Sequence, residues 1–134
     1  MIEIMLSYAL SLTGTPYVYG GNNPLTGLDC SGFAIEVLRS VETIPRDMTA
    51  QSLYLYLAQI GWRSHLSRGS VLFFGQTRNN ISHVEIALND KISIGASGGD
   101  SLVRTIEDAK KHGAFVKIRP IRKDLVAVLE PTFL

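Results

Sequence analysis

The stretch GTPYVYGGNNPLTGLDCSGFAIEVLRSV, residues 14–41, changes character near its midpoint. Its first half is rich in Gly, Asn and Pro, a composition typical of a long shaped loop. After Leu28, apolar residues recur at three- and four-residue steps, which predicts a helix from Cys30 to about Val41 with Asp29 as its N-cap. This arrangement places Cys30 in the first helical turn, where backbone N–H groups have no partner within the helix.

The segments around this stretch predict helices first and strands later. Residues 2–12 and 49–60 carry apolar stripes at helical spacing, and Gly61 closes the second of them. The second half of the chain turns to short, partly alternating runs bounded by turn residues, which predict strands. We therefore expect an α+β fold, with N-terminal helices packed on an antiparallel β-sheet, and a single domain over residues 1–134. The predicted strands cover residues 71–74, 83–88, 91–96, 115–121 and 127–129, with a hairpin turn at 89–91.

Composition excludes several classes of protein. The chain has 134 residues, of which 46% are hydrophobic, and a chain of this size can bury its own core without disulfide or metal staples. A net charge of +1 is too small for a protein that holds nucleic acid through a general positive field. No apolar run approaches the ~20 residues that cross a bilayer, so we expect no integral membrane segment. Glu3 stands where a signal peptide has Lys or Arg, so we expect no signal peptide either.

Cys30 is the strongest candidate for chemistry. It is the single cysteine, so it has no internal disulfide partner, and no second Cys or close His pair offers the spacing of a metal site. A thiol at a helix N-terminus is stabilised as a thiolate, so we expect its pKa to be lowered. A buried, unreactive cysteine is the alternative interpretation. Among the three histidines, His65 and His112 lie in polar stretches typical of the surface, whereas His83 opens an apolar strand and is the expected partner.

Several segments resemble, in order and spacing, the NlpC/P60 family of cysteine peptidases. The resemblance extends over about residues 5–121 and is most specific in the PYVYGG loop and the LDCSGF helix start. It implies a papain-like α+β fold that needs no cofactor and hydrolyses amide bonds in the stem peptides of bacterial peptidoglycan. The matching segments are GTPYVYGGNNPLTGLDCSGF at 14–33, IPRDMTAQ at 44–51, LSRGSVLFF at 66–74, ISHVEIAL at 81–88 and ISIGAS at 92–97.

The resemblance also implies roles for individual residues. Cys30 matches the nucleophile and His83 the general base. Tyr17 matches a residue whose hydroxyl lies near the nucleophile and helps to hold the oxyanion; a loop-anchoring aromatic is the alternative interpretation, and the two are compatible. Asp29 could likewise be a plain helix cap. The residues expected to line the substrate cleft are Asp29, Ser31 and Ser82.

The sequence departs from the family pattern at two positions that bear on catalysis. The usual pattern has Gly two residues after the catalytic His and a third polar residue twelve after it, whereas this chain has Glu85 and Gly95. Residues 83 and 85 share one face of a strand, so Glu85 could occupy the space that Gly95 leaves and orient His83. A solvated carboxylate at the strand edge is an equally plausible interpretation. Ser93 and Ser97 are weaker candidates for the same role.

A basic cluster near the C-terminus is expected to be a solvated face rather than a binding patch. Its members are Lys110, Lys111, Lys117, Arg119, Arg122 and Lys123.

Two functions from different classes remain open at this level. The first is an active peptidoglycan hydrolase. Such an enzyme could be cytoplasmic, or it could act on the cell wall as a phage virion component, an effector or a released lysin. The second is a catalytically silent papain-like module that binds wall peptide or serves as a structural component. A related thiol acyltransferase or lipid hydrolase is a third possibility, but such enzymes usually carry an apolar membrane anchor, and none is evident in the sequence.

Overall fold

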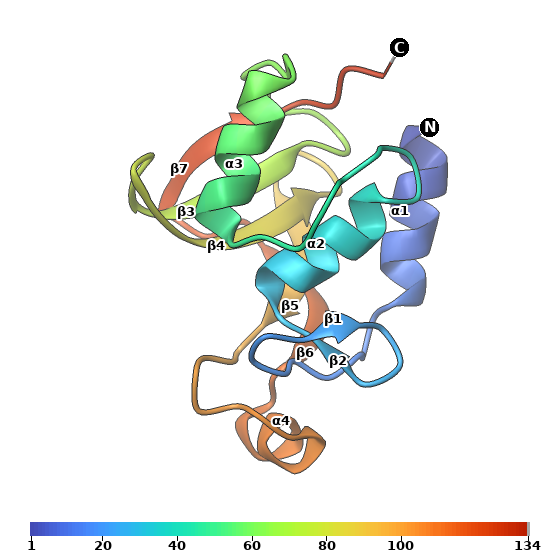
Figure 1. Cartoon of the computed structure of the whole chain (residues 1–134), viewed down its shortest axis with the longest axis vertical. Helices are drawn as coiled ribbons and strands as arrows, with labels where there is room; N and C mark the ends of the chain where they lie inside the picture. The colour runs from blue at the N-terminus through green and yellow to red at the C-terminus, as the bar shows by residue number, and fades with distance from the viewer. Residues whose placement is uncertain (134) are drawn as a thin grey trace.

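The computed structural model of the chain, described here for residues 1–133, has a five-stranded sheet and four helices (Figure 1). All neighbouring strands of the sheet are antiparallel, in the order β6-β5-β4-β3-β7. The helices are α1 (Ile2–Ser11), α2 (Cys30–Leu38), α3 (Ala50–Gln59) and α4 (Ile106–His112). The strands of the sheet are β3 (Val71–Thr77), β4 (Asn80–Ala87), β5 (Ile92–Ser97), β6 (Phe115–Pro120) and β7 (Leu125–Leu129).

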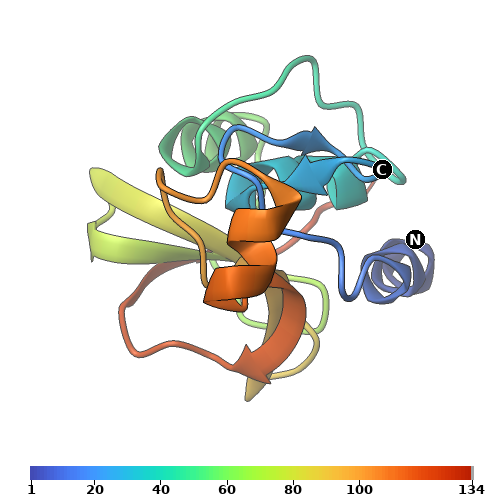
Figure 2. The same cartoon turned by 90° about the horizontal axis from the view of Figure 1, so that it is seen from below.

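Helices α2 and α3 cover one face of the sheet, as the view from below shows (Figure 2). The main core lies between these layers, where Phe33 and Leu53 from the helices meet Phe73 from β3. The opposite face carries a much smaller apolar cluster around Leu72 and Phe74. Strand residues that alternate along β3 and β4 therefore enter two different environments.

The helix starts follow from their capping residues. The Asp29 side chain accepts a hydrogen bond from the Gly32 N–H at 2.7 Å, and the Thr49 hydroxyl accepts one from the Ser52 N–H at 3.1 Å. The predicted α+β architecture, the first three helices and the five strands are confirmed within a few residues. Helix α2 ends at Leu38, however, rather than near Val41, because the next residues close turns onto its last carbonyl groups.

Three short elements escape the sequence prediction. The loop over residues 17–28 contains a short hairpin formed by β1 (Asn22–Asn23) and β2 (Gly27–Leu28). Helix α4 buries only Ala109, so it has no apolar stripe to reveal it. Its signal lies in its ends instead, since Thr105 caps its start and Gly113 adopts a left-handed conformation, with φ of +64°, just after its end.

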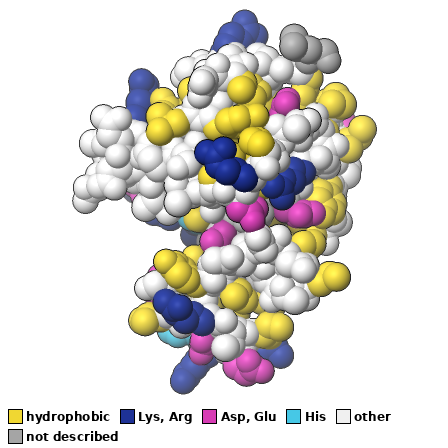
Figure 3. Space-filling model, in the orientation of Figure 1, with side chains coloured by type: hydrophobic (Ala, Val, Ile, Leu, Met, Phe, Trp, Pro, Cys, Tyr) yellow, Lys and Arg dark blue, Asp and Glu magenta, His cyan; other side chains and the backbone are white. Residues whose placement is uncertain are grey.

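No helix within residues 1–133 is long and apolar enough to cross a membrane. Acidic and basic side chains are interspersed on the face shown in Figure 3 and do not form a patch of one sign. This distribution agrees with the small net charge of the chain.

Candidate active site

Cys30 lies where the sheet opens between β4 and β5. The Leu88 N–H donates to the Ile92 carbonyl, so the N–H groups of Ile86 and Val84, two and four residues earlier, also point toward β5. The described pairing of β4 with β5 ends at Ile86, and the Val84 N–H instead faces the sulfur of Cys30. The start of α2 therefore meets the sheet at a gap in its hydrogen-bond ladder, at the residue that follows His83 in β4.

The expected lowering of the Cys30 pKa is wrong for the resting protein. Burial, aided by the negative charge of Asp29, raises the pKa of the thiol to about 11. The backbone N–H groups of Val84, Ser31 and Cys30 oppose this rise but do not outweigh it. The sequence shows the helix terminus, which favours the thiolate, but it does not show the desolvation, which disfavours it. Because the pKa of the thiol is raised, its ionisation at neutral pH requires a base that takes its proton.

His83 is bonded to Glu85 on the face of β4 that points away from the helices. Its Nε2 lies 2.6 Å from Glu85 Oε2, and its ring packs against Phe74 with centroids 5.6 Å apart. The Glu85 side chain is fully buried, and its other oxygen accepts a hydrogen bond from the Ser93 hydroxyl at 2.7 Å. The predicted inward contact of Glu85 with His83 is present, and the solvated alternative is wrong.

The charge of Glu85 fixes the tautomer of His83. Burial opposes ionisation of Glu85, but hydrogen bonds from His83 and Arg119 outweigh it and lower the pKa of this carboxyl to about 2. An ionised carboxylate only accepts hydrogen bonds, so the ring hydrogen of neutral His83 lies on Nε2. In that neutral form, Nδ1 is the ring nitrogen with a free lone pair.

Gly95 provides the space that Glu85 occupies. A Cβ atom built on Gly95 would lie 2.5 Å from Glu85 Cγ and 2.9 Å from its Cδ, closer than such atoms approach in folded proteins. The side chain that the family pattern carries at position 95 is thus replaced by one that reaches the same space from position 85.

The sequence suggested that Arg119 belongs to a solvated basic face, and this expectation is wrong. Its guanidinium donates to Glu85 Oε2 through both Nε and Nη2, and Nη2 lies 3.2 Å from His83 Nε2. Strand alternation places Arg119 of β6 on the face of the sheet that carries Glu85 of β4, but the number of basic residues around Arg119 in the sequence masked this contact.

Tyr17 is buried, with 7% of its surface exposed. Burial raises the pKa of its hydroxyl, and the charges of Cys30 and Asp29 add to this effect, so both groups lie near it. Its ring lies against Gly99, where an added Cβ would approach a ring carbon to 2.2 Å. This effect agrees with the predicted proximity of Tyr17 to Cys30, the role of Tyr17 at the oxyanion stays a prediction, and Gly99 is a neighbour that sequence reasoning missed.

A cavity of about 290 Å³ opens beside the start of α2. Asp29 and Ser31 line it, as does Asp47, which accepts a hydrogen bond from the Asn22 side chain. Two of the three predicted cleft residues therefore share one hollow. The third, Ser82, is exposed on β4 beside His83 and is not among the residues that line this cavity.

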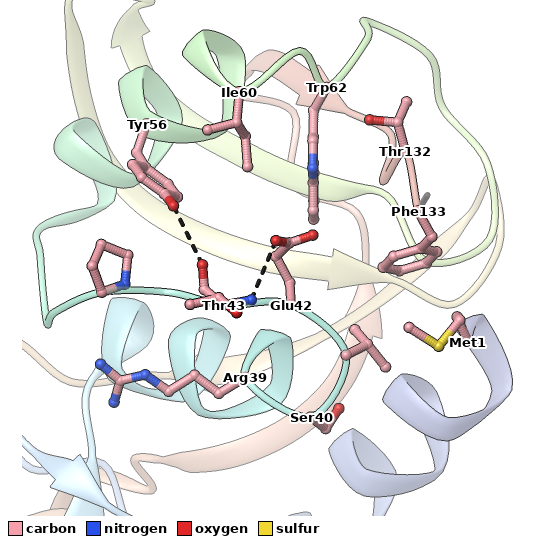
Figure 4. Close-up of a pocket in the computed structure, with 12 residues that line it drawn as sticks. Met1, Arg39, Ser40, Glu42, Thr43, Tyr56, Ile60, Trp62, Thr132 and Phe133 are labelled. Atoms are coloured by element: carbon pink, nitrogen blue, oxygen red, sulfur yellow. Dashed lines mark hydrogen bonds between the residues drawn. The ribbon is translucent and has the colours of Figure 1, made fainter.

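A larger cavity, of about 730 Å³, lies elsewhere and contains none of the predicted site residues (Figure 4). It lies between the C-terminal ends of α2 and α3 and the chain end near Phe133, with Trp62 and Tyr56 among its lining residues. Cavity size alone therefore does not identify the chemistry of this protein.

The other histidines are on the surface, as expected. His65 is exposed and pairs with Glu130 at 3.3 Å, and His112 is exposed at the end of α4. Over residues 1–133, no group of three or more His, Cys, Asp or Glu side chains is arranged to hold a metal ion.

Comparisons with known proteins agree on one family. The model of the NlpC/P60 family matches residues 14–119. The chain is 37% identical over 87 residues to the bifunctional muramidase/DL-endopeptidase CwlT of Bacillus subtilis, covering 63% of this chain and 26% of that protein. It is 33% identical over 86 residues to the murein DD-endopeptidase MepH of Escherichia coli, covering 63% and 32%. The chain thus spans about a quarter to a third of the length of these curated relatives.

A solved structure supports the same assignment over nearly the whole chain. The NlpC/P60 domain of the peptidoglycan hydrolase SagA superposes with a TM-score of 0.65 and 25% identity, covering 98% of this chain and 99% of that one. Because the family match includes most of the residues and the fold agrees with it, the chain belongs to the NlpC/P60 family.

Proposed function

We propose that this chain is a cysteine endopeptidase domain that hydrolyses amide bonds in peptidoglycan stem peptides. One observation carries the proposal: the single cysteine lies at a helix N-terminus and faces the Val84 N–H of β4, and the residue before Val84, His83, is bonded to a buried, ionised carboxylate. The names of the curated relatives, both endopeptidases, support the substrate class. No specific observation favours the alternative hypothesis, that the chain is a catalytically silent module.

In the proposed mechanism, His83 acts first as base. Its Nδ1 takes the proton of Cys30, and Glu85 stabilises the resulting imidazolium. The thiolate sulfur then forms a bond to the carbonyl carbon of the amide. The carbon–nitrogen bond breaks as the imidazolium gives its proton to the leaving amine. His83 then takes a proton from water, whose oxygen bonds to the thioester carbon; the carbon–sulfur bond breaks, and the imidazolium returns the proton to the Cys30 sulfur.

The developing oxyanion would be stabilised by donors near Cys30. Backbone N–H groups at the start of α2 and the Tyr17 hydroxyl are the candidates, and such donors act mainly on the transition state. Asp29 and Ser31 would bind the substrate along the cavity they line, and Ser82, exposed on β4 beside His83, would contact the substrate outside that cavity. We propose that the protein acts on the cell wall, as a phage lysin, tail-associated enzyme or effector.

The test is cleavage of muropeptides prepared from purified sacculi, followed by liquid chromatography and mass spectrometry of the new amino termini. Cys30→Ala and His83→Ala should abolish product formation while the fold is retained. His112→Ala, a matched change of an exposed histidine, should leave the rate unchanged. Binding of muropeptides without cleavage by the wild-type chain would instead establish the silent module.

A further inference from the structure

Arg119 contacts two members of the candidate site although it comes from another strand. Its side chain is 28% exposed, whereas that of Glu85 is fully buried. Both donors of the guanidinium fork go to the Glu85 oxygen that also accepts the bond from His83. Arg119 thus supplies the cation that a buried carboxylate requires.

The charges of these three side chains balance when the imidazole is neutral, since ionised Glu85 and cationic Arg119 then sum to zero. Removal of the guanidinium would leave one uncompensated negative charge on a side chain without solvent contact. A site of this kind restores neutrality by taking up a proton.

That proton has the same consequence wherever it resides. If it adds to the imidazole, both ring nitrogens are protonated. If it adds to Glu85, the carboxyl donates to Nε2 and the ring hydrogen moves to Nδ1. In both forms Nδ1 carries a hydrogen and no longer accepts one from Cys30.

We propose that Arg119 is a positioning residue that, through Glu85, keeps His83 Nδ1 unprotonated at neutral pH and so able to take the proton of Cys30. The inference rests on the proposed role of His83 as base. Other charged or titratable groups lie around the His83–Glu85 pair, but among the Lys and Arg side chains of residues 1–133 only the guanidinium of Arg119 is bonded to the Glu85 carboxylate. They are Cys30 and Asp29 at the start of α2, Lys117 opposite Gly95 on β6, and Arg122 and Asp124 after β6.

Nuclear magnetic resonance of the ¹⁵N-labelled chain tests this without any substrate. Long-range proton–nitrogen correlations report which ring nitrogens of His83 are protonated, and His83→Asn identifies its signals. At pH 7 the wild-type chain should show neutral His83 with its hydrogen on Nε2. Arg119→Met should raise the apparent pKa of the His83–Glu85 pair by about one unit or more and place a hydrogen on Nδ1.

Matched variants separate charge from structure. Arg119→Lys should keep the wild-type protonation, and Arg122→Met, which removes a guanidinium paired with Asp124, should shift the titration by less than half as much. In the double variant Glu85→Gln with Arg119→Met the extra proton should be lost. Arg119→Gln carries the test if Arg119→Met does not fold.

The proposal is overturned if Nδ1 stays unprotonated at pH 7 in the Arg119→Met or Arg119→Gln variant, or if the extra proton persists in the double variant. A wild-type chain that fails to cleave muropeptides would count against the proposed function, but it would leave this measurement intact.

Discussion

The two faces of β4 contrast sharply although they share one backbone. Val84 and Ile86 point to the helices and are fully buried among apolar side chains. Between them, Glu85 points the other way and is just as buried, but its neighbours are an imidazole, a guanidinium and a hydroxyl. Equal burial therefore has two outcomes: apolar packing on one face holds the fold, and paired charges on the other face surround the proposed general base, His83.

The largest expected effect concerns the helix-facing side. Phe73 is fully buried and packs edge-to-face on Tyr54 with ring centroids 5.2 Å apart. Phe73→Ala should lower the free energy of unfolding by ~3–5 kcal/mol, because a large cavity replaces the ring. Urea denaturation measures the loss. Activity per folded molecule should persist, and a folded but inactive Phe73→Ala chain would break the division between the two faces.

Glu85, on the face of β4 that points away from the helices, should make the stability of the fold sensitive to acid. Folding lowers the pKa of Glu85 from 4.5 to about 2, so its ionised form stabilises the fold above about pH 4.5. This contribution, on the order of 3 kcal/mol, should be lost as the pH falls from 4.5 toward 2. Unfolding free energies of the wild-type chain and Glu85→Gln, measured from pH 6 to pH 2.5, should converge toward the acid end. Parallel curves would mean that Glu85 is not ionised in the folded protein.

Glu85 should matter for turnover as well. Glu85→Gln keeps the shape but removes the charge that stabilises the imidazolium, so kcat should fall by about 10- to 100-fold with little change in KM. The exchange Glu85→Gly with Gly95→His should recover part of the loss, because a polar side chain again reaches His83. Undiminished turnover in Glu85→Ala would show that His83 needs no partner on this face.

The smallest expected effect is at Tyr17. Tyr17→Phe should lower kcat by about tenfold and leave KM nearly unchanged, a smaller loss than the ~100-fold of a principal oxyanion donor, because backbone N–H groups share the charge. Steady-state kinetics on muropeptides separates the two parameters. A rise in KM alone would make Tyr17 a binding or anchoring residue.

The sequence predicts the fold better than it predicts the electrostatics of the site. Periodicity and capping locate three helices and five strands, since these signals are local. The contact between Glu85 and His83 is predictable as well, because strand alternation places both on one face. The raised pKa of Cys30 and the position of Arg119 are not, because burial and pairing across strands depend on how distant segments pack.

In the space between β4 and β5, the Glu85 side chain leaves no room for even a Cβ atom at position 95. Substitutions at the two positions are therefore not independent in evolution. Any lineage that acquires a carboxylate at 85 must first lose, or simultaneously lose, the side chain at 95, since the two would collide. We expect these positions to covary among related chains, with glycine at one whenever the other carries the partner of the histidine.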